Sequence, residues 1–143
     1  MPYVKIWVHL IWTTKNREPF ILPELKPNLL THIKTNAGEK GITLDTINAV
    51  ADHVHCLVLL KSDHTIAKVV QLLKGESSHW INSNHLVPFQ FEWQDEYIAV
   101  SVSSSAVEVV RKYIGNQDKH HEKDSLELRY EEFLKDLMIG EKQ

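Results

Sequence analysis

Residues 51–60 read ADHVHCLVLL, which is the composition of a buried β-strand that carries two histidines. Valine, leucine and cysteine favour a strand inside a sheet, and the run ends in four consecutive apolar residues. Because side chains two residues apart on a strand point to the same face, His53 and His55 project together, while Val54 and Cys56 face the other way. Two imidazoles on one face indicate a site for a metal ion or a phosphate.

The segments on both sides of this strand predict an α+β domain. The expected strands cover residues 3–12, 42–50, 51–60 and 91–103, the last with a bend around 94–96. The expected helices cover residues 23–40, 65–82 with an interruption at Gly75, 105–119 and 126–138. The first six elements of this order, β-α-β-β-α-β, match the split βαβ arrangement of ferredoxin-like domains. We therefore expect an antiparallel sheet of four to five strands with helices on one face and a C-terminal helical extension.

Two local details follow from the same patterns. Residues 51–52 are the only plausible turn between the second and third strands, which predicts an antiparallel hairpin. Ser105 and Glu108 have the spacing of a capping box, in which a hydroxyl and a carboxylate satisfy the first backbone amides of a helix.

Composition places the chain among ordinary globular proteins. Its 143 residues suffice for one domain with a substantial core, and 43% are hydrophobic and 24% charged. No apolar run approaches the length of a membrane span and no signal pattern is present, so a cytoplasmic location is expected. The single cysteine excludes an internal disulfide and a cysteine-rich zinc site. The formal charge is −3, with the acidic excess concentrated after residue 121.

The predicted third helix adds two functional groups to the histidine pair. Tyr113 and Gln117 are four residues apart, so they share one helix face that is otherwise apolar. Two neutral imidazoles and an amide oxygen can form an open three-ligand site for a divalent ion, with positions left for substrate oxygens. A tyrosine beside such an ion can attack a phosphodiester and form a covalent phosphotyrosine.

These residues together resemble the motifs of a known family. Residues 51–58 resemble the histidine-hydrophobic-histidine (HUH) motif of single-tyrosine transposases from small insertion sequences, the IS200-like family. Residues 113–117 (YIGNQ) resemble the catalytic helix of that family, in which a nucleophilic tyrosine precedes a metal-binding glutamine by four positions. The resemblance covers about residues 3–121.

The resemblance implies a DNA transposase that cleaves and rejoins single-stranded DNA. His53, His55 and Gln117 would bind Mg²⁺ or Mn²⁺, and Tyr113 would form a 5′-phosphotyrosine and release a free 3′-OH. The family works as a homodimer on DNA hairpins at element ends, and in many members the active site is shared between subunits, so use of Tyr113 in cis or in trans stays open. Residues 1–121 would form the HUH endonuclease domain, and the acidic helical tail 122–143 would belong to the same domain.

Other residues have weaker assignments. His9, on the first strand, either is satisfied within the sheet or neighbours the histidine pair, and Asp52 is either a turn residue or a partner of a metal-bound histidine. The candidates for contacts with DNA are Lys15, Asn16, Arg17, Lys61, Lys68, Lys74 and His120.

Two other functions remain as alternatives. One is a catalytically inactive or domesticated module of the same fold that binds a DNA hairpin or RNA. The other is a small metal-dependent hydrolase that uses the two histidines without a covalent step, which leaves Tyr113 without a role.

Overall fold

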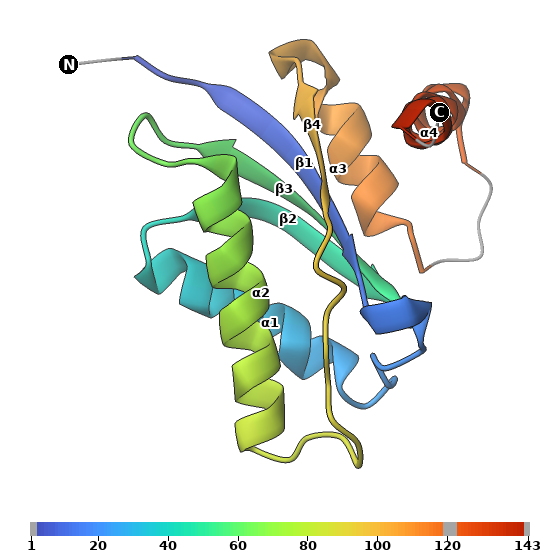
Figure 1. The fold of residues 1–143 in the computed structure, drawn as a ribbon. Coiled ribbons are helices and arrows are strands. Elements are labelled where there is room, and N and C mark those ends of the chain that lie inside the picture. Colours follow the sequence, from blue (N-terminus) through green and yellow to red (C-terminus); the bar gives the residue numbers. More distant parts are fainter. Residues whose placement is uncertain (1–2, 119–122, 142–143) are drawn as a thin grey trace.

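The sheet is antiparallel and has four strands. A computed structural model describes residues 3–118 and 123–141 of the chain (Figure 1). The strands are β1 (Ile6–Thr13), β2 (Thr43–Val50), β3 (His53–Leu60) and β4 (Ile98–Val102). Their spatial order is β2-β3-β1-β4, so the first and third strands lie at the centre. This order confirms the predicted split βαβ arrangement.

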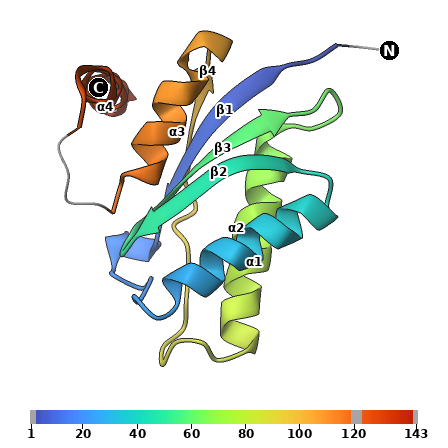
Figure 2. The same ribbon diagram turned by 180° about the vertical axis from the view of Figure 1, so that it is seen from behind.

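Four α-helices pack on the sheet, and they lie on both of its faces. They are α1 (Lys26–Glu39), α2 (Ile66–Ser83), α3 (Val107–Gly115) and α4 (Ser125–Glu141). Figures 1 and 2 show α1 and α2 together on one side of the sheet, and α3 with α4 on the other. The prediction that all helices share one face is therefore wrong for the second pair.

The sequence of β1 explains the two-sided packing. Val8, Leu10 and Trp12 pack in the core under α1 and α2, whereas Trp7 and Ile11 pack against the opposite pair of helices. A strand that is apolar on both faces needs cover on both, because either face would otherwise expose large side chains to water. In the sequence, the run IWVHLIW is apolar at every position except His9, which lies on the second of these faces.

The hairpin between β2 and β3 places the two histidines. The turn at residues 51–52 is confirmed, with Val50 paired to His53. On the other side of β3, Thr13 pairs with His53 and Ile11 pairs with His55. Because paired residues of antiparallel strands share a face, both histidines lie on the face that α3 and α4 cover, while Val54 and Cys56 lie in the opposite core.

Three local predictions need correction. Gly75 does not interrupt α2, because Leu73 and Ser77 on either side are buried and hold the helix against the core. The predicted capping box does not form: a 3₁₀ turn at Ser104–Ala106 precedes α3, and Ser105 bonds the Ser103 hydroxyl instead. The third helix ends at Gly115 rather than residue 119, so Gln117 lies in the turn after it.

The predicted fourth strand is also shorter than expected. The strand β4 begins only at Ile98, after the predicted bend. Of the residues before the bend, Trp93 forms an isolated β-bridge with Thr14.

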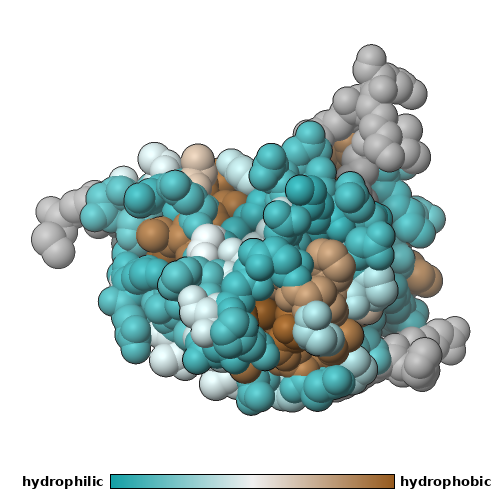
Figure 3. Space-filling model, turned by 60° about the horizontal axis from the view of Figure 1, so that its bottom comes forward, coloured by the Kyte–Doolittle hydropathy of each residue, from teal (hydrophilic) through white to brown (hydrophobic). Residues whose placement is uncertain are grey.

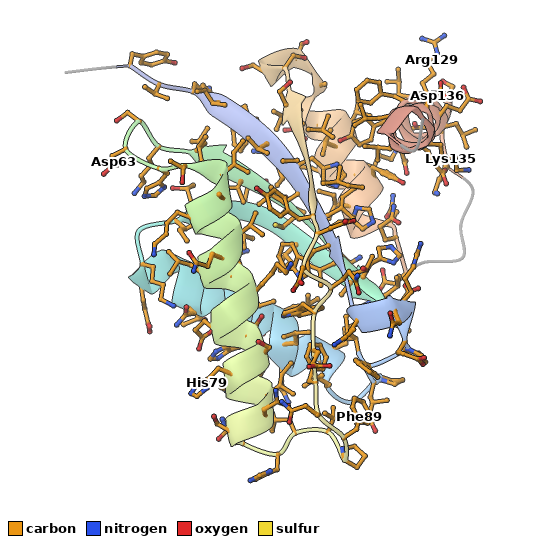
Figure 4. All side chains as sticks on the ribbon, viewed as in Figure 1. Asp63, His79, Phe89, Arg129, Lys135 and Asp136 are labelled. Carbon is orange, nitrogen blue, oxygen red and sulfur yellow. The ribbon has the colours of Figure 1, made fainter. Side chains whose placement is uncertain are left out.

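With its lower end tilted forward, the molecule shows a mostly hydrophilic face whose most extensive apolar area lies low and right of centre (Figure 3). The loop after α2 lies at this end and carries Leu86 and Phe89, both partly exposed (Figures 1 and 4). No helix within residues 3–118 and 123–141 has the length and apolar character that crossing a membrane requires.

Candidate active site

His53 begins β3, and its ring is oriented by the residue before it. Its Nδ1 lies 2.7 Å from Oδ1 of Asp52, whose Oδ2 accepts a hydrogen bond from Arg17 Nε at 3.2 Å. Burial raises the pKa of Asp52, but the hydrogen bonds and charges of His53 and Arg17 outweigh this effect and hold that pKa below its usual value. Asp52 is thus both the turn residue and the partner of His53, and it leaves His53 Nε2 available for a ligand.

His55 lies deeper and is held by a second imidazole. Its Nδ1 is 3.0 Å from His9 Nε2, and His9 Nδ1 in turn contacts the Tyr130 hydroxyl of α4. Burial lowers the pKa of His9 to about 4. Burial, together with the nearby charges of His9, His53 and Lys123, lowers the pKa of His55 to about 2. Both rings are therefore neutral at pH 7. Both readings of His9 hold together: it is satisfied within the sheet, and it neighbours the histidine pair.

Tyr113 reaches the same place from α3, sixty residues later in the chain. Val110 and Ile114 are fully buried against the sheet, which turns Tyr113 toward the histidines. The centroid of its ring lies 5.9 Å from that of His55. Burial and the negative charge of Glu131 raise the pKa of Tyr113, so its phenol is protonated at neutral pH, while Lys123, with Nζ 5.3 Å from the ring centroid, acts in the opposite direction.

Gln117 follows α3, and its side chain folds back toward the helix. Its Nε2 donates to the carbonyl oxygen of Tyr113 at 3.0 Å. The end of the helix is tied to β2, because Asn48 Nδ2 donates to Ile114 O at 3.0 Å and to Asp118 Oδ1 at 2.9 Å. Hydrogen bonds from Lys26 and Asn48 lower the pKa of Asp118 to about 2, so this anchor is ionised at neutral pH.

The four predicted site residues line one cavity of about 810 Å³. His53 and His55 come from β3, Tyr113 from α3 and Gln117 from the turn after it. Further lining residues include Arg17, Tyr97, Glu131, Leu134 and Lys135. In the part of the chain that the structure describes, no three histidine, cysteine, aspartate or glutamate side chains are grouped as a metal site. A metal ion here would therefore depend on two imidazoles and the Gln117 amide.

The donor set fits a divalent ion that accepts mixed ligands. Both histidines use Nδ1 for hydrogen bonds to protein groups, so their Nε2 atoms are the ones that can bind a metal. A site of two nitrogens and one amide oxygen suits Mn²⁺ well and Mg²⁺ less well, since Mg²⁺ prefers oxygen ligands.

Comparison with known proteins decides the family. Residues 2–117 match the family model described as "Transposase IS200 like". The chain belongs to the IS200-like transposase family. It is 27% identical over 121 residues to the ISDra2 transposase TnpA of Deinococcus radiodurans, with 81% of this chain and 84% of that protein covered. The resemblance read from the sequence is thereby confirmed, and membership makes this chain an enzyme that acts on DNA.

Solved structures agree with the fold of this IS200-like transposase. A crystal structure of a candidate transposase from Deinococcus radiodurans is 31% identical, with a TM-score of 0.65, and the match covers 82% of this chain and 95% of that one. A REP-associated tyrosine transposase bound to a REP hairpin is similar in fold, with 16% identity, a TM-score of 0.59 and coverage of 81% and 68%.

Four of the candidate DNA contacts of this transposase lie in the turn after β1 or beside the second cavity. Lys15, Asn16 and Arg17 form the short 3₁₀ turn directly after β1, close to His53. Lys74 donates to the backbone carbonyls of Gln94 and Asp95 at 2.5 and 3.1 Å. Lys15 and Lys74 also line a second cavity of about 570 Å³, between α2 and residues 90–97.

The other candidates lie elsewhere. Lys61 follows the last residue of β3 and Lys68 lies in the first turn of α2, at the end of the sheet opposite His53. His120 lies outside the residues that the structure describes.

Sequence reasoning missed Asn48 and the contribution of α4. Tyr130 and Leu134 are four residues apart on α4 and pack beside Tyr113. That spacing was the available signal for a buried face, but the abundant charges around it indicated only an acidic helical tail. Asn48 carried no signal, because its partners lie 66 and 70 residues away.

Proposed function

We propose that this transposase cleaves and rejoins single-stranded DNA through a covalent bond between Tyr113 and a 5′ phosphate. The observation that supports this most is the cavity that His53, His55, Tyr113 and Gln117 line together. Each of these residues alone has an ordinary structural role, whereas a phenol beside two imidazoles and an amide is a set suited to phosphoryl transfer.

The reaction uses the groups of this chain as follows. The Tyr113 oxygen attacks the scissile phosphorus as the phenol loses its proton, and the bond from phosphorus to the 3′ oxygen breaks. This leaves a 5′-phosphotyrosine and a free 3′-OH, and attack by another 3′-OH on the phosphotyrosine rejoins a strand. Lys123 beside the ring favours the phenolate, which opposes the raising effect of burial on the pKa of Tyr113.

We also propose that His53, His55 and Gln117 hold a divalent ion, Mn²⁺ or Mg²⁺. Such an ion stabilises negative charge on the phosphoryl oxygens. The two histidines are suited to hold it because both are oriented through Nδ1, and the burial of His55 keeps that ring neutral at pH 7.

The proposed DNA partner is a single strand that carries a hairpin. The REP-associated tyrosine transposase of similar fold is bound to a hairpin, which supports this choice without extending its details to this chain. A homodimer is also proposed. Mixing Tyr113→Phe and His55→Ala chains tests whether the active site is shared between subunits, because an adduct forms only if Tyr113 serves the histidines of the partner.

A covalent-adduct assay tests the proposed chemistry. The protein is incubated with Mn²⁺ and a pool of labelled single-stranded hairpin oligonucleotides with randomised flanks, then denatured and separated by size. We expect a labelled protein band that Tyr113→Phe abolishes. Arg129→Ala is the control, since Arg129 projects from α4 into solvent (Figure 4). An adduct that survives Tyr113→Phe overturns the assigned nucleophile.

The same assay separates the alternatives. Cleavage without an adduct indicates a hydrolase. Absence of cleavage, together with retention of the hairpin DNA by the undenatured protein, indicates a binding module.

A further inference from the structure

We propose that His9 and Tyr130 are positioning residues that hold His55 in the tautomer able to bind a metal ion. Helix α4, which lies beyond the residues matched by the family model, then takes part in the metal site. This inference rests on the proposed function for the assignment of His55 as a metal ligand.

A continuous chain of contacts connects α4 to His55. The Tyr130 hydroxyl contacts His9 Nδ1, and His9 Nε2 lies 3.0 Å from His55 Nδ1. The rings of His9 and Tyr130 are stacked, with centroids 5.6 Å apart and planes 26° from parallel. His9 is completely buried between the sheet and the helices that cover it, so water does not compete for these hydrogen bonds.

The direction of the hydrogen bonds decides what His55 can do. A neutral imidazole has one N–H and one nitrogen with a free lone pair. When His55 donates from Nδ1 to His9 Nε2, its Nε2 lone pair is free for a metal, and His9 then donates from Nδ1 to the Tyr130 oxygen. In the opposite direction Tyr130 donates to His9, His9 donates to His55, and the proton on His55 Nε2 blocks a metal bond.

The tautomer of His53 is fixed by its partner Asp52, whereas that of His55 depends on His9 and Tyr130. The ionised carboxylate of Asp52 can only accept, so His53 must carry its proton on Nδ1. The fully buried layer around His9 does not suit a carboxylate, because an ionised group there would lose its hydration. A neutral imidazole and a phenol can hold His55 without a buried charge, but only while the rings stay in hydrogen-bond contact.

The packing of α4 keeps this chain of contacts intact. Leu134, one turn after Tyr130, is buried against Ile11 and Val100 of the sheet and against Tyr113. Lys123 Nζ lies 2.8 Å from Glu131 Oε2, and Lys112 of α3 lies 2.5 Å from Asp124 just before α4. These contacts fix the helix on both sides of Tyr130, so the phenol stays within reach of His9.

Mn²⁺ binding by the full chain, measured by calorimetry, tests the role of His9. We expect His9→Leu to weaken binding about tenfold, the lower end of the effect of losing a partner of a metal-ligating histidine. His9→Gln should restore most of the affinity, because its amide oxygen can accept from His55 Nδ1. Tyr130→Phe should weaken binding severalfold, because it leaves a buried N–H of His9 without an acceptor, and Arg129→Ala should bind as wild type does.

The tautomer itself can be observed in the wild-type chain. In the metal-free full-length protein with ¹⁵N-labelled histidine, we expect the ring spectrum to show protons on Nδ1 of both His55 and His9. The spectrum of His55→Ala assigns the His55 signals. A proton on His55 Nε2 in the metal-free protein overturns the proposal, even if a His9 variant fails to fold.

The outcomes separate this inference from the function on which it rests. If wild type and His55→Ala bind Mn²⁺ equally, His55 is not a ligand and the proposed metal site itself fails. If His55→Ala abolishes binding but His9→Leu binds as wild type does, the metal site stands and the positioning role is wrong. If His9→Gln binds as weakly as His9→Leu, the hydrogen bond to His55 is not the cause and the proposal is again wrong.

Discussion

The two histidines of the site obtain their orientation by different means at the level of single residues. His53 is partly exposed and depends on a carboxylate, whereas His55 is buried and depends on a neutral imidazole. A carboxylate is tolerated at residue 52 because the turn between β2 and β3 lies near solvent and Arg17 balances its charge. Of the two proposed metal ligands, His53 is therefore sensitive to local charge and His55 to packing.

Removing the charge of Asp52 tests the first of these ligands. Asp52→Asn should weaken Mn²⁺ binding about tenfold, because an amide holds His53 less strongly and no longer requires its proton on Nδ1. The matched control is Asp63→Asn, at the far end of β3, where the carboxylate is 84% exposed (Figure 4). Calorimetry measures the Mn²⁺ affinity of both variants. Equal affinities would exclude a role for Asp52 in metal binding.

The buried histidines make the stability of the chain depend on pH. The pKa of His9 is lowered to about 4 in the folded state, so between its ordinary value of 6.5 and that value the unfolded state binds more protons. Stability is then fully present above pH 6.5 and is lost as the pH falls toward 4. From pH 7 to 4.5 without metal, His9 alone should lower the free energy of unfolding by about 2 kcal/mol, and His55, whose pKa is lowered further, adds to this fall.

Urea denaturation at several pH values measures this loss. His9→Leu should flatten the dependence, whereas His79→Leu, which changes an exposed histidine on α2, should leave it as steep as in wild type. An unchanged slope in His9→Leu contradicts the assignment.

Residue type and spacing were enough to predict one part of this site. Two histidines separated by one residue and a tyrosine followed by a glutamine four positions later are local patterns, and the structure gathers all four side chains around one cavity. Tyr130 and Asn48 could not be predicted in the same way. Their partners lie 121 and 66 residues away, and a sequence pattern does not encode contacts between elements whose packing is still unknown.

At the scale of elements, the strand pairing was predictable and the side of the sheet taken by α3 was not. The order of elements and the short turn at residues 51–52 restrict the sheet to few topologies, so the antiparallel hairpin followed directly. The position of α3 depends on the second apolar face of β1, where Trp7 and Ile11 pack. His9 interrupts that face with a polar ring, which hid its buried character in the sequence.

Helix α4 should be the least stable element that touches the cavity, and Leu134 is its main apolar anchor. Leu134→Ala should raise hydrogen exchange in α4 and in α3 around Tyr113, because a buried leucine contributes about 2–5 kcal/mol. Leu137→Ala is the matched control, since Leu137 is 37% exposed and Leu134 only 3%. Exchange rates that change equally in the two variants, or only in β2 and β3, would show that α4 is held in another way.

For the whole molecule, one face of the sheet forms the larger hydrophobic core and the other face carries the candidate active site. Its one face packs with α1 and α2 into the larger core, and its other face carries the histidines, Tyr113 and the cavity. The two central strands serve both faces at alternate positions, so Val54 and Cys56 contribute to the core while the histidines beside them form the site. This arrangement places the histidines on a central strand of the sheet.

The same geometry ranks the lysines that DNA can contact. A DNA strand whose phosphate reaches Tyr113 must cross the end of the sheet where His53 and the turn at Lys15–Arg17 lie. Lys61 lies beyond the opposite end of β3. Lys15 is about half exposed and has a weak ion pair with Glu92 at 3.5 Å, so its charge is available to a phosphate. Lys15→Ala should weaken binding of a hairpin oligonucleotide with a single-stranded flank and reduce the slope of log affinity against log salt by about 1. Lys61→Ala removes the same charge and should leave that slope unchanged, and titrations at several salt concentrations that gave the two variants equal slopes would mean that DNA does not follow this path.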